Sequence, residues 1–430
     1  MAHKKLRAGW AWVPSLYFAE GLPYVVVMTL AGIMYTKMGV SNSEMAFYTS
    51  WLMLPWLIKP FWSPIVDVIS TKRRWVIVMQ WAIAVSLACV AFALPGALYF
   101  RFTMACFFAI AFLSATHDIA ADGYYMIGLD EPDQAFFVGI RTTFYRAAML
   151  FCQGPVVMAA GWLEESTGDI PQAWALTFYG LSALFLILAF YNSIAMPRAE
   201  HRRPAAPRGQ RVAEVVREFG QSFATFFRKP HIWAALAFMV LYKLPEAQII
   251  KMINPFLLHS PEQGGLGLTT AEVGLVYGTV GVIGLLLGGI IGGIVASRGG
   301  LRRWMMPMAW SMSLTCLSFV YLAYASDHSL PAICGCVFIE QFGYGFGGTA
   351  YILYLIRFSA GPFKTSHYAI CTGFMTLGTM LPGMAAGWIE EQLGYGPFFL
   401  WTMVCCVATI AVAARSRGTV RYMETSENNL

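Results

Sequence analysis

The stretch MAAGWLEESTGD at residues 158–169 returns as MAAGWIEEQLGY at residues 384–395. Other similarities keep nearly the same offset: SPIVDVISTKRRW (63–75) with GIVASRGGLRRW (293–304), and Leu22-Pro23 with Leu244-Pro245. In the first of these pairs a small residue, a turn and two basic residues precede a Trp. Because the similarities occur in the same order, the chain is predicted to consist of two parallel repeats related by an axis along a membrane normal.

Composition indicates that both repeats lie in a membrane. Of the 430 residues, 58% are hydrophobic and 12% are charged, against about 25% charged in ordinary soluble domains. Apolar runs long enough to cross roughly 30 Å of hydrocarbon recur along the whole chain. No short segments with period-two alternation are found, so a helical polytopic protein is predicted rather than a β-barrel.

Twelve transmembrane helices in two pseudo-symmetric six-helix bundles are expected. The predicted helices are 10–37, 44–69, 75–97, 100–128, 135–162, 172–195, 231–258, 269–297, 303–325, 330–356, 365–390 and 397–415. The predicted domains are an N-terminal bundle (1–195), a cytosolic linker with an amphipathic helix (196–230), a C-terminal bundle (231–415) and a cytosolic tail (416–430). The basic N-terminal segment is interpreted as the start of a retained first helix, because no small-residue cleavage site follows it.

The distribution of basic residues predicts the orientation. With both termini in the cytosol, 22 of the 29 Lys and Arg residues fall in cytosolic tails and loops, and only Lys37 and Arg101 fall on the other side. This asymmetry obeys the positive-inside rule. The net charge of +6 therefore reflects membrane topology and not nucleic-acid binding. Membrane lipids are the expected surroundings, and a monomer is the expected state.

Two segments are interpreted as packing or surface elements. Residues 211–229 place Val and Phe side chains along one helical stripe with charges opposite, which predicts an interfacial helix on the cytosolic leaflet. Glycines of the eighth helix recur at spacings that let helices approach closely, and they are interpreted as packing positions: Gly274, Gly278, Gly281, Gly284, Gly288 and Gly292.

Charged groups inside the spans are the candidate site, because an unpaired charge in the bilayer costs several kcal/mol. The helix 4–helix 5 hairpin turns near Pro132, so equal distances from the turn predict Asp122 beside Arg141 and Asp118 beside Arg146. A carboxylate whose cation is shared with substrate would be a proton carrier, and two permanent salt bridges are the alternative. Both readings stay open at this point.

The seventh helix is unusually polar for a membrane span. It contains Lys243, Glu246 and Lys251 within one sector, together with Gln248 and Asn254. Two prolines loosen the same helix and free carbonyl groups, so a cavity-lining role is predicted. Three further polar candidates lie in the first and tenth helices: Glu20, Glu340 and Tyr351.

Motifs for enzymatic chemistry are absent from the sequence. There is no P-loop, no H-E-x-x-H and no G-x-S-x-G, and none of the nine cysteines shows metal-site spacing. We therefore expect no metal, no cofactor, no ATPase partner and no enzymatic activity. The energy source would be a proton gradient. One enzymatic alternative is a membrane-embedded enzyme with His117 and Asp118 as acid and base.

Several segments together resemble a known transporter family. They are EGLPYVVV (20–27), LPWLIKPFWSPIVD (54–67), FLSATHDIAAD (112–122), LYKLPEA (241–247), TTAEVGLV (269–276) and TSHYAI (365–370). The twelve helices and the basic turns resemble the major facilitator superfamily, and the segments look like signatures of AmpG-type muropeptide permeases and their acetyl-CoA-transporter-like relatives.

The resemblance implies a fold and an activity. It implies proton-driven import of anionic cell-wall fragments, the anhydro-muropeptides, across a bacterial inner membrane for peptidoglycan recycling. It also implies that Lys59, Asp118, Asp122, Lys243 and Glu246 occupy polar positions of the family. A smaller amino sugar, a peptide or a siderophore remains an alternative substrate.

The residues lead to one expected mechanism and its alternatives. The two halves are expected to alternate around a central cavity lined by helices 1, 4, 7 and 10. The proton-coupling candidates are Asp118, Asp122, Glu20, Glu246 and Glu340. The substrate-binding candidates are Lys243, Lys251, Gln248, Asn254, Arg141, Arg146, Lys59, His117 and Tyr351. An exporter of a small amphiphilic or peptide-like solute would share all these features.

Overall fold

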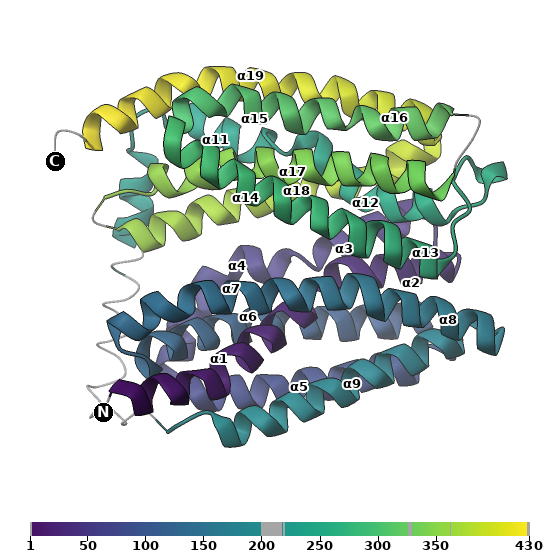
Figure 1. The fold of residues 1–430 in the computed structure, drawn as a ribbon, viewed down its shortest axis with the longest axis horizontal. Coiled ribbons are helices and arrows are strands. Elements are labelled where there is room, and N and C mark those ends of the chain that lie inside the picture. Colours follow the sequence, from purple (N-terminus) through teal and green to yellow (C-terminus); the bar gives the residue numbers. More distant parts are fainter. Residues whose placement is uncertain (1, 199–216, 218–219, 326–328, 362, 428–430) are drawn as a thin grey trace. The chain divides into compact units, whose positions relative to one another are not determined.

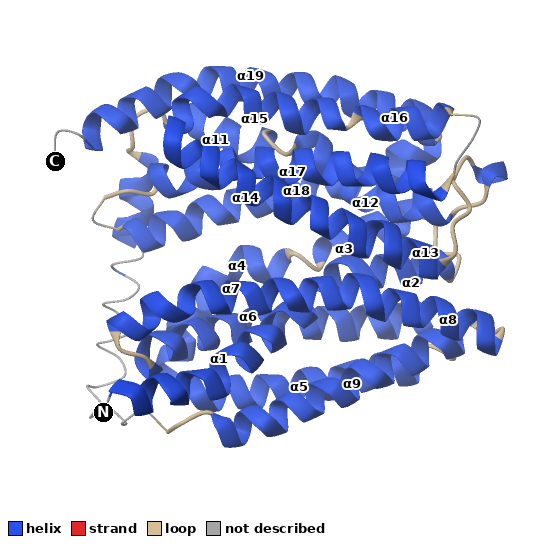
Figure 2. Cartoon of the chain, in the orientation of Figure 1, coloured by secondary structure: helices blue, strands red, loops and turns tan. Residues whose placement is uncertain are grey.

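The computed structural model describes residues 2–198, 217, 220–325, 329–361 and 363–427. These residues form helices joined by short connections, with no strand among them (Figure 2). The chain divides into two compact units. The N-terminal unit comprises residues 1–38 and 52–215, and the C-terminal unit comprises residues 39–51 and 216–430. Residues 39–51 therefore belong with the second unit, whereas the sequence places them inside the first bundle.

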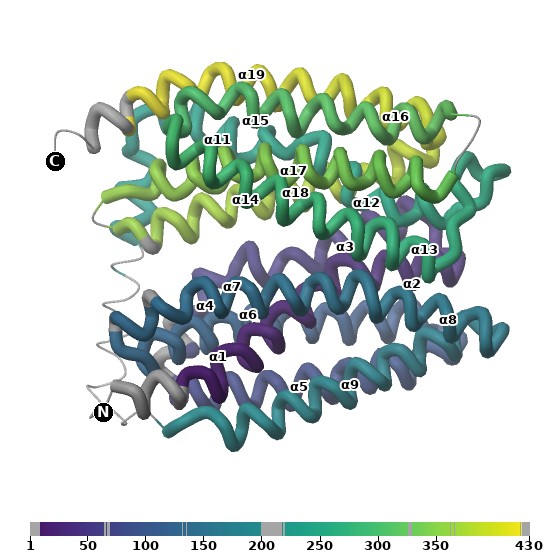
Figure 3. Tube along the Cα trace, in the orientation of Figure 1, coloured from purple at the N-terminus to yellow at the C-terminus, as the bar shows by residue number. Residues whose placement is uncertain are grey.

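The N-terminal unit is a bundle in which α5 and α9 run side by side (Figure 1). Short π-helical turns interrupt its first and fifth long helices, and Figure 3 traces α7 and α8 as one continuous tube. Its elements are α1 (Ala2–Val25), a π turn (Val26–Leu30), α2 (Ala31–Lys37), α4 (Leu54–Ile69), α5 (Lys72–Ala93), α6 (Tyr99–Gly128), α7 (Glu131–Phe151), a π turn (Cys152–Val156), α8 (Val157–Thr167) and α9 (Ile170–Ala195).

The C-terminal unit repeats this helical organisation and adds α3 from the N-terminal part of the chain. Its elements are α3 (Asn42–Trp51), α11 (Ile232–Leu241), α12 (Leu244–Leu258), a 3-10 turn (Pro261–Gln263), α13 (Thr270–Leu275), a π turn (Val276–Gly281), α14 (Val282–Gly299), α15 (Leu301–Thr315), α16 (Leu317–Tyr324), α17 (Leu330–Phe358), α18 (Lys364–Leu393) and α19 (Tyr395–Glu427).

Every predicted span is occupied by helix. Among the described residues, ten segments are long and apolar enough to cross a membrane. The other two predicted spans are occupied by α3 with α4 and by α17. The all-helical membrane architecture expected from the sequence is therefore confirmed.

Prolines divide two of the predicted helices. The second predicted helix breaks between α3 and α4, where Pro55 stands in the first turn of α4. The seventh breaks between α11 and α12, where Pro245 stands in the first turn of α12. Proline lacks the donor that would continue the helix and is tolerated in a first turn. The carbonyl of Tyr242, freed at the second break, accepts a hydrogen bond from the Thr409 hydroxyl at 3.0 Å.

Glycines bring α14 and α17 into direct backbone contact. A Cβ added at Gly288 would lie 2.1 Å from the Phe342 carbonyl oxygen, and one added at Gly284 would lie 2.7 Å from that of Phe338. Neither side chain could be accommodated without moving a helix backbone. The packing role predicted for the glycines of the eighth helix is therefore confirmed at these two positions.

Each copy of the MAAGW repeat contacts, within its own unit, a residue close in the chain to the turn between α2 and α3. Within the N-terminal unit, Glu164 lies 3.4 Å from the Lys37 ammonium. Within the C-terminal unit, Glu390 accepts a hydrogen bond from the Asn42 side chain at 2.6 Å. The glycine of the second copy, Gly387, packs directly against the Asn42 backbone. Glu164 and Glu390 are equivalent positions of the two repeats, and the residues that they contact, Lys37 and Asn42, are five positions apart in the chain.

The described parts of the linker and the tail are helical and pack on the C-terminal unit. Most of the predicted linker helix lies outside the described residues. In its described part, residues 220–227 are helical and Phe226 is buried in the core of the C-terminal unit. The predicted tail continues α19 as far as Glu427, and Val420 is buried in the same core. Both segments pack on the C-terminal unit because their apolar side chains fit that core.

Candidate functional site

The described part of the N-terminal unit brings together a group of charged residues that are buried or partly buried. Lys59 of α4 forms an ion pair with Asp118 of α6. The Glu20 carboxyl group, from α1, is hydrogen-bonded to the Asp118 carboxyl group. Glu20 is only 9% exposed, and its Oε2 has no hydrogen-bond partner. Three separate helices therefore supply the charges of this group.

One helical turn farther along α6, Asp122 forms a second ion pair. The Arg141 guanidinium of α7 lies 3.0 Å from the Asp122 carboxylate. Tyr17 of α1 donates a hydrogen bond to Asp122 at 3.2 Å and accepts one from Arg141 at 2.9 Å. The guanidinium also lies 4.9 Å from the ring centres of both Tyr17 and Tyr125. The predicted pairing of Asp122 with Arg141 is confirmed.

The second predicted pairing is wrong. Asp118 pairs with Lys59, and Arg146 is exposed on α7. Counting residues from the hairpin turn gives the depth of a side chain along its helix. It does not give the direction in which the side chain points, and the Arg146 side chain is exposed.

The charges in this group do not balance. Glu20, Asp118 and Asp122 would contribute three negative charges against the two positive charges of Lys59 and Arg141. A carboxyl group without a counter-ion is costly to ionise in a membrane interior. The group is therefore neutral when it holds one proton. Because Asp118 and Asp122 each contact a cation, Glu20 is the carboxyl group that would hold that proton.

His117 belongs to a separate structural network. Its Nε2 accepts a hydrogen bond from the Gln80 amide at 3.0 Å, and Gln80 in turn accepts one from Asn192 at 3.2 Å. Ser15 donates to Asn192 at 2.6 Å. The network links α1, α5, α6 and α9. The Nε2 atom of His117 is engaged by a protein partner in this network, and its predicted substrate contact stays a prediction.

The C-terminal unit contains a second polar group at the break between α11 and α12. The Lys243 ammonium donates a hydrogen bond to the Tyr344 hydroxyl at 3.2 Å. It also lies 5.0 Å and 5.2 Å from the ring centres of Tyr344 and Tyr351. The Tyr351 hydroxyl itself donates to the Met239 carbonyl. Tyr351 therefore offers its ring to Lys243, while its hydroxyl is engaged by the backbone.

Two acidic residues lie close to Lys243. Glu246 is in the first turn of α12 and Glu340 is in α17, and each is 1% exposed. Their carboxyl groups interact with each other, and Lys243 acts electrostatically on Glu246. The structure thus brings together Lys243, Glu246 and Glu340 from the predicted set.

The other candidates of the seventh helix point elsewhere. Gln248 accepts a hydrogen bond from the Trp401 indole at 2.9 Å and donates to the Leu244 carbonyl at 3.1 Å. Lys251 donates to the Thr49 hydroxyl at 2.9 Å. Asn254 is 6% exposed, and its Oδ1 has no partner. Gln248 therefore contacts α19, Lys251 contacts α3, and Asn254 lies in the buried interior.

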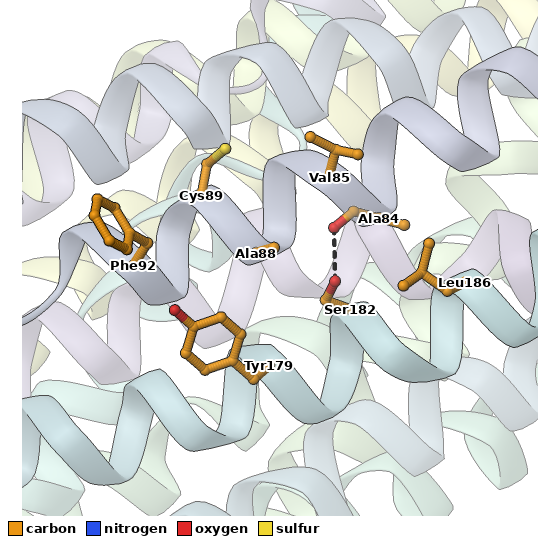
Figure 4. A pocket seen from close by; sticks show the side chains of 8 residues that line it. All are labelled: Ala84, Val85, Ala88, Cys89, Phe92, Tyr179, Ser182 and Leu186. Carbon is orange, nitrogen blue, oxygen red and sulfur yellow. Dashed lines mark hydrogen bonds between the residues drawn. The ribbon is translucent and has the colours of Figure 1, made fainter.

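A groove on the N-terminal unit does not contain the candidate residues. It has a volume of about 350 Å³ and lies between α5 and α9 (Figure 4). Its wall is almost entirely apolar, and the Ser182 hydroxyl donates to the Ala84 carbonyl at 2.8 Å. None of the charged residues described above lines it. In the described part of the chain, no three His, Cys, Asp or Glu side chains are grouped to hold a metal ion.

Sequence reasoning missed two kinds of contact. Tyr17 and Tyr125 surround Arg141, and Gln341 donates to Glu340 at 2.9 Å. Tyr17 lies three positions before Glu20, so it shares a helix face with that residue. This spacing was available in the sequence. The contact of Tyr125 with an arginine of another helix was not.

Membrane-length helices with partly buried charged groups between them define a multi-pass membrane protein. The family model described as Major Facilitator Superfamily matches residues 15–306, and the chain belongs to that superfamily. The predicted resemblance to AmpG-type permeases is also confirmed. The chain is similar to the anhydromuropeptide permease of Escherichia coli (strain K12), with 26% identity over 96% of this chain and 80% of the relative.

A further relative supports the same class, and two solved structures share the fold. A putative transporter, AmpG 4 of Rickettsia conorii, is 24% identical over 92% of this chain and 94% of its own length. The fold is similar to that of a proton dependent oligopeptide transporter, with a TM-score of 0.71 and 12% identity over 99% of this chain and 100% of the other. A D-xylose-proton symporter gives a TM-score of 0.67 and 11% identity over 95% and 96% of the two chains.

Proposed function

We propose that this protein is a proton-coupled importer of an anionic cell-wall fragment, an anhydro-muropeptide or a related amino sugar or peptide. The substrate class follows from the similarity to anhydromuropeptide permeases. The observation that carries proton coupling is the charge group around Asp118, in which three carboxyl groups accompany two cations. Such a group changes its net charge when it gains or loses one proton.

The chemistry of the two ion pairs supplies a coupling step. Protonation of Asp118 weakens its attraction for Lys59, and protonation of Asp122 weakens that for Arg141. Each released cation is then available to a substrate carboxylate. Return of the cation to its carboxylate displaces both substrate and proton. Lys243 and Lys251 would supply further positive charge for an anionic substrate.

The surroundings complete the proposal. The protein would lie in a bacterial inner membrane as a monomer, with both termini in the cytosol, as the basic residues predict. The proton gradient would drive the cycle, so no cofactor is required. Transport would proceed by alternating access of the two units to the two sides of the membrane.

Proteoliposomes test the proposal directly. We expect an inwardly directed proton gradient to drive accumulation of a labelled anhydro-muropeptide, and a protonophore to abolish it. Asp122→Asn should lose accumulation while Glu165→Asn, a change at an exposed acidic residue, retains it. Uptake that ignores an imposed pH gradient would falsify proton coupling. Counterflow with none of the muropeptide, free amino sugars and dipeptides would contradict the substrate class.

A further inference from the structure

Glu246 and Glu340 form a pair of neighbouring carboxyl groups in the C-terminal unit. Both residues are 1% exposed, and their carboxyl groups interact across α12 and α17. The pair lies in a different unit from the Asp118 group, which belongs to residues 1–38 and 52–215. It therefore requires its own explanation.

The pair lacks hydrogen-bond donors. Gln341 donates one hydrogen bond, at 2.9 Å, to Oε2 of Glu340. If both groups were ionised, three of their four oxygen atoms would have no hydrogen-bond donor: both oxygens of Glu246 and Oε1 of Glu340. Two carboxylates in contact repel each other, and burial adds to the cost. One proton held between them removes the repulsion and supplies a missing donor.

The residues around the pair favour a single proton. The charged and titratable groups that act on it are Lys243, Tyr344 of α17, Cys316 next to α16, and Cys406 of α19. Lys243 is the one cation among them. Two carboxyl groups beside one cation are neutral overall when one carboxyl group is protonated.

Helix geometry indicates which of the two carboxyl groups carries the negative charge. Glu246 lies in the first turn of α12, where the partial positive charge of the helix terminus stabilises an anion. Glu340 lies in the middle of α17, far from either end of that helix. The proton therefore resides on Glu340, whose O–H donates to the Glu246 carboxylate.

We propose that Glu246 and Glu340 form a second proton-binding site, with Glu340 as the carrier and Glu246 as its acceptor. The site binds and releases one proton per transport cycle, a role that rests on the proposed transport function. The Asp118 group has three carboxyl groups and two cations, and this site has two carboxyl groups and one cation. Each group therefore has one carboxyl group without a cation of its own. Among the described residues no third His, Cys, Asp or Glu side chain joins the two carboxyl groups, and the ligand proposed for the site is a proton.

Infrared spectroscopy of the purified protein tests the site without any substrate. We expect the spectrum of the unmodified protein to contain carbonyl stretching bands of protonated, buried carboxyl groups, one of which is lost in Glu340→Gln and kept in Glu20→Gln. Glu165→Gln, at an exposed position, should leave the band unchanged. Glu340→Asp, which keeps a carboxyl group, should restore a shifted band and guards against misfolding of the glutamine variant. A Glu340→Gln spectrum that has lost none of these carbonyl bands overturns the proposal.

Transport measurements then test the role of the site. In Glu340→Gln we expect counterflow without a gradient to continue and accumulation driven by a pH gradient to be lost. Accumulation equal to that of the unmodified protein would overturn the role in coupling. Replacement of sodium by choline should change neither the band nor uptake, and a dependence on sodium would overturn the assignment to protons. If none of the muropeptide, free amino sugars and dipeptides is transported at all, the proposed function fails while the infrared result still decides the site.

Discussion

At the scale of single residues, the Lys59–Asp118 pair is the contact that most directly links stability to function. Its side chains are 27% and 21% exposed, so the pair is partly shielded from water. Removing one partner leaves an uncompensated charge, which costs about 3–5 kcal/mol at a fully buried site. We expect Lys59→Ala to cost about 2 kcal/mol here because of the partial exposure.

A double-mutant cycle checks this expectation. The variant Lys59→Ala/Asp118→Asn should be more stable than Lys59→Ala alone, since no lone charge remains. The measurement is thermal unfolding in detergent micelles. Strictly additive effects of the two changes would show that the pair contributes nothing as a pair.

Outside the membrane spans, His259 gives a pH-dependent contribution to stability. Burial lowers the pKa of its imidazole below the ordinary value of 6.5, and its Nδ1 lies 2.9 Å from the Tyr395 hydroxyl. The unfolded chain therefore binds more protons than the folded chain as the pH falls through that value. Stability from this residue is present above about pH 6.5 and decreases below it.

Hydrogen exchange tests this sign. We expect amides around residues 259–268 to exchange faster, relative to the rest of the protein, when the pH is lowered from 7.5 to 5.5, after correction for intrinsic rates. His259→Gln should remove the extra acceleration, whereas Tyr395→Phe should keep it. Protection that increases on acidification would contradict the assignment.

At the scale of elements, the α14–α17 contact depends on glycine. A Cβ at Gly288 would lie 2.1 Å from the Phe342 carbonyl oxygen, whereas one at Gly293 would meet nothing within 4 Å. Overpacking of a close helix contact costs about 1–3 kcal/mol. We therefore expect Gly288→Ala to lower the melting temperature in detergent and Gly293→Ala to leave it unchanged or raise it slightly. Equal melting temperatures for the two variants would show that the helices separate without cost.

Prolines in first turns explain why two predicted helices are divided. Pro55 and Pro245 each stand in the first turn of a new helix, as the residue type predicts. The sequence also predicted that prolines would loosen the seventh helix. It did not predict that α3 would belong with the C-terminal unit, because that placement depends on contacts of Asn42 and Ser43 with Glu390 and Glu391 of α18.

At the scale of the whole molecule, the pattern of charge and hydropathy along the sequence was sufficient to predict the all-helical membrane architecture. Long apolar runs have only one way to satisfy their backbone polar groups in a bilayer, which is to form helices. Fold class, helix positions and the internal repeat could therefore be predicted from residues alone. The candidate site was predicted less well: Asp122 with Arg141 was correct, whereas Asp118 pairs with Lys59 and not with the exposed Arg146.

The sequence by itself determined that this protein spans a membrane with helices, that its halves repeat, and which ionisable residues lie within the spans. Those properties depend on composition and on spacing along the chain. Only the tertiary structure decided which of these residues meet, because the direction of a side chain depends on how each helix is rotated and where it breaks. Glu246 and Glu340 show this most clearly, since they are 94 positions apart in the chain and become partners only when α12 packs near α17.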